Sequence, residues 1–179
     1  MSQSKRNFTI EVEDIKAVCP LGEVVGNKMI SEKKIPVISC EGECFRGEIA
    51  RLASHIVSKE EPYCRGCHGE MFTAPTSAMA EWAKKAKKVI VIDGCFMHCH
   101  GRIMKNVVGQ ENMIQFDALP IYNQDNKYSE TMIIDEIPEE ERKYLAQKVA
   151  DKILSILQED SSYDSDFQTA SGGGCTLAH

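Results

Sequence analysis

The chain lacks any apolar segment long enough to cross a membrane. Its 179 residues are 42% hydrophobic, yet no apolar run approaches the roughly 18 residues that span a bilayer. Residues 1–7 carry charge with no apolar core behind them, which is not the pattern of a signal peptide. We therefore expect a cytoplasmic protein that makes no use of a membrane.

The chain also has no excess of positive charge. The formal net charge is −6 at pH 7. Part of this charge belongs to a C-terminal stretch without lysine or arginine, which carries Glu159, Asp160, Asp164 and Asp166. The rest of the chain is close to neutral. Because nucleic-acid-binding domains present a clustered basic surface, we expect no nucleic-acid partner.

Motifs of the common nucleotide-binding and hydrolase sites are missing as well. The chain has no G-x-G-x-x-G, no P-loop and no G-x-S-x-G elbow. Cysteine, in contrast, is abundant, with eight residues. In a cytosolic chain of this size, such a count favours metal binding or thiol chemistry over disulfides. Six of the cysteines form close pairs, which are Cys40/Cys44, Cys64/Cys67 and Cys95/Cys99.

Hydrophobic patterning predicts alternating strands and helices. Residues 35–39, 89–92 and 113–117 are short apolar runs typical of strands, and the run at 89–92 is apolar throughout, as in a strand covered on both faces. Helical stripes follow at 49–57, 79–86, 103–108 and 145–157. This order predicts an α/β fold of three layers with a mostly parallel, Rossmann-like sheet. We further expect short strands at 8–12, 71–73 and 131–134, and loops at 62–70 and from 119 onward.

The same patterning divides the chain into three parts. Residues 1–34 are predicted to be an N-terminal extension packed on the domain, and residues 35–158 the α/β domain itself. Residues 159–179 are acidic, rich in serine and then in glycine, which predicts a disordered tail.

Two cysteine pairs share one design. Cys40 and Cys95 each follow a predicted strand, and Cys44 and Cys99 each stand four residues later, where a helix begins. If the strands are neighbours, four sulfurs meet at the carboxyl edge of the sheet, where open α/β sheets bind their ligands. The partial positive charge of a helix N-terminus favours the thiolate, and four thiolates suit zinc.

The third pair, Cys64 and Cys67, is followed by His68. It is predicted to supply ligands to the same metal, to form a second site or to act as a redox pair, and the absence of a clear following helix favours the metal or structural role. His98 and His100 flank Cys99, and each could be a ligand or a proton carrier. Asp93 and Asp117 end strands, where a carboxylate holds a ligand, orients a histidine or caps a turn.

These residues resemble the DGC-domain proteins. The resemblance lies in Asp93-Gly94-Cys95 after an apolar strand, in Cys99 beyond it, and in the upstream Cys40-x3-Cys44, and it spans roughly residues 35–158. Members of this family are small prokaryotic proteins regarded as zinc binders through four cysteines. The resemblance therefore implies metal ligation by Cys95 together with Cys40, Cys44 and Cys99, with Cys64 and Cys67 as competing candidates.

Three functions are consistent with this sequence. The first is zinc binding by cysteine thiolates at the strand ends, in a structural site with four ligands or a catalytic site with three. The second is an iron–sulfur or thiol enzyme that handles electrons or sulfur, since four cysteines also hold such clusters. The third is a metal carrier or sensor. A metal ion is the expected partner, and the sequence identifies neither a substrate nor a protein partner.

Overall fold

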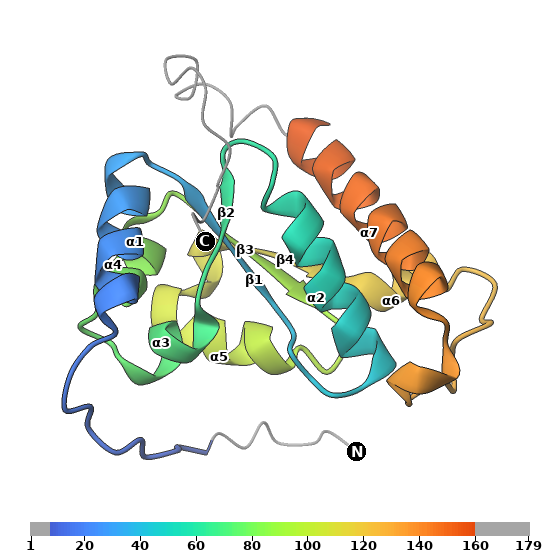
Figure 1. Cartoon of the computed structure of the whole chain (residues 1–179), viewed down its shortest axis with the longest axis horizontal. Coiled ribbons are helices and arrows are strands. Elements are labelled where there is room, and N and C mark those ends of the chain that lie inside the picture. Colours follow the sequence, from blue (N-terminus) through green and yellow to red (C-terminus); the bar gives the residue numbers. More distant parts are fainter. Residues whose placement is uncertain (1–7, 160–179) are drawn as a thin grey trace.

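Four parallel strands form the centre of the fold, in the order β2-β1-β3-β4 (Figure 1). Their bounds are Ile35–Ser39 for β1, Tyr63–Arg65 for β2, Val89–Asp93 for β3 and Met113–Asp117 for β4. Each neighbouring pair is parallel. The computed structural model describes residues 8–159, so the predicted tail lies almost wholly outside the described residues.

Helices cover both faces of this sheet. One face carries α2, Phe45–Val57, α6, Ala118–Tyr122, and α7, Glu139–Glu159. The other carries α1, Pro20–Ser31, α3, His68–Thr73, α4, Ala78–Lys85, and α5, Cys99–Val108. Two short 3-10 turns, η1 at Gln110–Asn112 and η2 at Ile134–Glu136, complete the described elements. The three-layer α/β prediction is confirmed.

The central strands are apolar throughout because both of their faces are covered. Every residue of β1 and β3 is buried. Val37 and Ile90 pack towards α2 and α7, whereas Ile38 and Val91 pack towards the helices of the opposite face. Side chains alternate along a strand, so one run of apolar residues supplies both cores.

Helix α7 follows its predicted stripe with one exception. Leu145, Val149, Ile153 and Leu157 are buried, whereas Ile156 is 37% exposed and lies outside the core. In α5 the same holds for Ile103, which is 44% exposed although it was expected in the stripe. Gly109 ends α5 with φ 85°, a positive angle that glycine adopts without strain.

Several short elements differ from the predictions. Tyr63–Arg65 is a strand rather than a loop, residues 71–73 belong to α3, and α6 occupies part of the expected loop. Residues 8–12 and 131–133 are not strands. Apolar runs of three to five residues do not distinguish strand from helix, and an isolated alternating run needs a neighbouring edge to pair with. In the described residues, no helix is both long and apolar enough to cross a bilayer.

The connections that follow β1 and β3 run towards opposite edges of the sheet, because β1 leads to β2 and β3 leads to β4. From β1 the chain passes through α2 on one face to β2, and then through α3 and α4 on the other face to β3. Loops at the carboxyl ends of β1 and β3 therefore leave in opposite directions. Such a switch point opens a crevice at the strand ends, where α/β proteins bind their ligands.

Candidate metal centre

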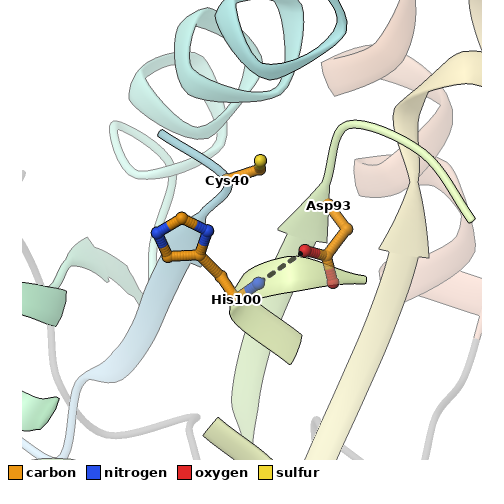
Figure 2. A group of neighbouring side chains, drawn as sticks. All are labelled: Cys40, Asp93 and His100. Carbon is orange, nitrogen blue, oxygen red and sulfur yellow. Dashed lines mark hydrogen bonds between the residues drawn. The ribbon is translucent and has the colours of Figure 1, made fainter. Parts of the chain in front are cut away.

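The carboxyl ends of β1 and β3 bring three potential ligands together. One donor atom from each of Cys40, Asp93 and His100 lies within 4.8 Å of the others (Figure 2). Cys40 follows β1, Asp93 ends β3, and His100 lies in the first turn of α5. The group therefore stands at the switch point, and its members come from segments more than fifty residues apart in the sequence.

Asp93 anchors the start of α5. Its Oδ1 accepts hydrogen bonds from the backbone N–H groups of His100 at 3.2 Å and Gly101 at 3.4 Å. Its Oδ2 accepts from the Gly101 N–H at 3.2 Å and from Gln115 Nε2 at 2.7 Å. Asp93 is completely buried. Among the roles expected for this acid, the structure therefore shows a cap, although of the following helix rather than of the Gly94 turn.

Glycine at position 101 permits this close contact. A Cβ atom there would lie 2.5 Å from Asp93 Oδ2 and 2.2 Å from Gln115 Nε2. Real Cβ atoms do not approach so closely, and both partners are fixed by their own hydrogen bonds. The helix can therefore begin against Asp93 only because residue 101 has no side chain.

His100 presents an unsatisfied nitrogen inside this group. Its Nδ1 is buried and has no hydrogen-bond partner among the described residues. Burial lowers the pKa of His100, against the opposing charges of Asp93 and Glu41. The ring of His68 packs edge-on against the ring of His100, with the two centroids 4.9 Å apart. Burial is the main cause that lowers the pKa of His68, and the nearby His100 lowers it further. Neutral imidazoles are the form that binds metals.

Cys40 is the most enclosed of the free thiols, with 8% of its surface exposed. Burial raises the pKa of Cys40, while backbone hydrogen bonds from Gly42 and Gly94 lower it, and Asp93 and Cys99 raise it. The N–H groups of Gly42 and Gly94 point at the sulfur and would support a thiolate. A bound cation would remove the remaining penalty of ionisation.

The other members of the two C-x3-C segments lie along the same edge. Cys44 is the N-cap of α2 and Cys99 is the first residue of α5, as predicted. A Cβ atom at Gly42 would lie 3.5 Å from the Cys40 sulfur and 4.0 Å from the Cys44 sulfur, so both thiols border this glycine. Cys44 and Cys95 are half-buried, and Cys99 is exposed.

The third cysteine pair is divided between the core and the surface. Cys64 lies in β2 with 1% exposure, within the core cluster on the α3 and α4 face. Cys67 is exposed at the N-cap of α3. A helix thus does follow this C-x2-C segment, contrary to the expectation from the sequence, but the two side chains face different surroundings.

His98 makes a separate contact at the next strand end. Its Nε2 lies 2.6 Å from Asp117 Oδ1. Both residues occupy N-cap positions, His98 of α5 and Asp117 of α6, and neither side chain makes a capping hydrogen bond. His98 has a left-handed backbone with φ 49°, which is uncommon for a residue other than glycine. Of the roles expected for Asp117, orientation of a histidine is the one that this contact fits.

The donors of this centre are suited to a transition metal. A thiol and a neutral imidazole are ligands of zinc, and an unpaired buried Nδ1 is an atom that a metal would satisfy. Sequence reasoning placed Cys40 and Asp93 at one sheet edge but did not select His100 over His98. The choice between the two histidines depends on the hydrogen bond from the His100 N–H to Asp93, which only the structure shows.

Comparison with known proteins identifies the family. The family model described as the DGC domain matches residues 36–149, which is more than half of the chain and includes the whole metal centre. No curated protein and no solved structure matched the chain. The chain therefore belongs to the DGC-domain family.

Proposed function

We propose that this protein binds a zinc ion at the carboxyl edge of its sheet, with Cys40 and His100 as the central ligands. The observation that carries the proposal is the approach of their donor atoms to within 4.8 Å of each other and of Asp93. The buried Nδ1 of His100 lacks another partner. A thiolate and an imidazole favour zinc over magnesium or calcium, which prefer oxygen.

Asp93 is a positioning residue in this proposal rather than a ligand. Its two oxygens already make four hydrogen-bond contacts with three donor groups, which are the His100 N–H, the Gly101 N–H shared between both oxygens, and Gln115 Nε2. A carboxylate offers about four lone-pair positions, so coordination would displace the bonds that hold His100 in place. Asp93 thus fixes the helix that carries the histidine.

Cys99 is the natural third ligand. It precedes His100 at the start of α5 and is close enough to affect the ionisation of Cys40. Its exposure leaves the thiol free to turn towards the centre. Cys44 and Cys95 are further free thiols at the same edge. Cys64 is not a candidate ligand, because it is disulfide-bonded and buried in the core.

Three ligands leave a fourth position for water or a substrate, which distinguishes a functional zinc site from a structural one. When bound, zinc would act there as a Lewis acid that polarises its fourth ligand. The protein residues hold the ion, exclude water on the Cys40 side and fix the imidazole. A structural role is not required by the fold, because two apolar cores already cover the sheet.

Metal analysis of variants tests this proposal. The full chain purified without added metal should contain a single zinc ion, and Cys40→Ala and His100→Ala should each lose it. Cys19→Ala is the matched control, because Cys19 is a free thiol that lies outside the centre, at the start of α1. Full zinc content in both Cys40→Ala and His100→Ala would refute the assignment. Brown protein with iron and sulfide would favour a cluster instead.

Metal transfer is a second candidate, supported by the exposure of Cys99 beside the buried Cys40. An exposed ligand can exchange to an incoming acceptor while a buried one retains the ion. A chromogenic chelator should then remove zinc from the folded protein within minutes. Release only upon unfolding would exclude a carrier.

A further inference from the structure

A second group of polar side chains lies between α2 and α6 and takes no part in the proposed zinc site. Arg46 and Tyr122 each bury a hydrogen-bond donor that has no partner among the described residues, namely Arg46 Nε and the Tyr122 hydroxyl. Tyr122 is only 2% exposed. Buried donors are nearly always paired, so two of them in one place indicate a missing acceptor.

Contacts between α2, α6 and the loop after β3 bring this group together. The Tyr122 ring packs edge-on against Phe45, with the centroids 5.9 Å apart, and Phe45 stands between Cys44 and Arg46. A Cβ atom at Gly94 would lie 2.7 Å from the Arg46 carbonyl carbon, so the loop that carries Cys95 touches the same turn. Two thiols therefore border the pair of donors.

Arg46 is the cation that acts on the Tyr122 hydroxyl, and the thiols of Cys44 and Cys95 are the other ionisable groups near it, together with Tyr128. The Arg46 guanidinium also donates from Nη2 to the Ser129 carbonyl at 2.6 Å, which fixes its orientation. Burial raises the pKa of Tyr122, although the charge of Arg46 opposes this, so the phenol keeps its proton and donates it. The N-terminus of α2, a helix of 13 residues, adds a partial positive charge.

We propose that Arg46 and Tyr122 form a binding site for a small oxyanion group, either a carboxylate or an inorganic oxyanion, beside the thiols of Cys44 and Cys95. A guanidinium and a helix N-terminus are standard partners of such groups. A groove of about 480 Å³ lies next to the site, and Cys44 is the residue of the site that lines it. Glu43 and Asp135 also line this groove and repel anions, so binding of an oxyanion depends on the donors of Arg46 and Tyr122.

Competing alkylation reagents test this site without reference to zinc or to any activity. Iodoacetate carries a carboxylate and iodoacetamide does not, and both transfer a carbon to a thiolate with loss of iodide. The rate ratio of the two reagents is measured at each cysteine of the full chain by peptide mass spectrometry. At Cys44 or Cys95 the ratio should exceed that at the exposed Cys19 by about tenfold, the effect of one charge-assisted hydrogen bond.

Variants that remove only the donors provide the controls. Arg46→Gln and Tyr122→Phe should lower the ratio to that of Cys19. Tyr128→Phe should leave it unchanged, because Tyr128 lies in the same aromatic cluster but directs its hydroxyl to Glu141. Far-ultraviolet circular dichroism verifies that each variant is folded.

Protection distinguishes the two sources of the oxyanion group. Slower iodoacetate labelling in acetate alone assigns the site to carboxylates, and slower labelling in sulfate as well extends it to inorganic oxyanions. Sodium chloride at equal ionic strength is the control. An equal reagent ratio at all thiols, no labelling at Cys44 and Cys95, or no protection by either anion would overturn the proposal.

Discussion

The carboxylate of Asp93 is completely buried, and hydrogen bonds from the N-terminus of α5 replace the water it loses. Backbone N–H groups at a helix N-terminus are unpaired within the helix, so an acid placed there satisfies them. Here the same contacts aim His100 at Cys40. One residue thus stabilises the fold and positions the metal centre.

Asp93→Asn separates these two roles. Replacing one oxygen with an NH2 group places a donor against the α5 N–H groups, so the free energy of unfolding should fall by about 2–4 kcal/mol. Urea denaturation measures this change. The Asp117 side chain is 27% exposed, so Asp117→Asn should lower the free energy of unfolding by less than about 1 kcal/mol.

Zinc content of the same variant gives the second measurement. Folded Asp93→Asn should still bind zinc, because the ligands are Cys40, Cys99 and His100. Loss of zinc from a variant that remains folded would mean that Asp93 is itself a ligand.

Gly101→Ala tests the close contact between α5 and Asp93. The new Cβ would meet Asp93 Oδ2 at 2.5 Å, so unfolding should become easier by about 1–3 kcal/mol despite the better helix propensity of alanine. Gly69→Ala is the matched control, because nothing lies within 4 Å of a Cβ at that helical position. Thermal unfolding of the control should occur at the wild-type temperature or slightly above it.

At the level of single residues, sequence reasoning found the strand-end groups but not their contacts. Cys40 and Asp93 were predictable, because each follows an apolar strand and parallel strands end at one edge. The roles of His98 and His100 were not, since the left-handed backbone of His98 and the cap at His100 arise only when α5 starts against Asp93. The burial of Cys64 and the exposure of Cys67 were also not predictable, because they depend on where β2 lies in the sheet.

At the level of elements, the long segments were predictable and the short ones were not. Helix α7 has 21 residues and a clear apolar stripe, so its pattern alone predicted it. Residues 131–133 look like an edge strand, but the Met132 carbonyl instead accepts a hydrogen bond from Phe45 N–H at the start of α2. A local pattern cannot reveal that a distant helix will use the backbone of the segment.

Two isoleucines of α7 test how the helix is oriented. Ile153 is fully buried against α2, so Ile153→Ala should lower the free energy of unfolding by about 2–5 kcal/mol. Ile156→Ala should cost less than about 1 kcal/mol, because that side chain is 37% exposed. Equal losses, measured by urea denaturation, would contradict the orientation.

For the molecule as a whole, the metal centre and the fold depend on one topology. The chain leaves β1 and β3 in opposite directions, and the space between these exits receives the ligands. Alternating strands and helices predicted the layers and therefore this edge. The strand order and the pairing of β1 with β3 come from packing across the sheet.

Because the ligands come from distant segments, zinc should stabilise the folded chain against the unfolded one. At free zinc one hundred times the dissociation constant, the gain is about 2.7 kcal/mol if the unfolded chain does not bind it. Chelation should lower the unfolding temperature accordingly. Cys40→Ala should unfold at the same temperature with and without zinc, whereas a persistent zinc effect in that variant would place the ion elsewhere.

X-ray absorption at the zinc edge distinguishes the candidate ligand sets, because it counts the sulfur and nitrogen neighbours of the bound ion. With Cys40, Cys99 and His100 as ligands, the shell should be mixed, with sulfur at about 2.3 Å from the two cysteines and nitrogen at about 2.0 Å from the histidine. In His100→Ala the nitrogen contribution should disappear. A shell of four sulfurs without nitrogen, unchanged in His100→Ala, would contradict the proposed ligand set and assign Cys44 and Cys95 to the ion.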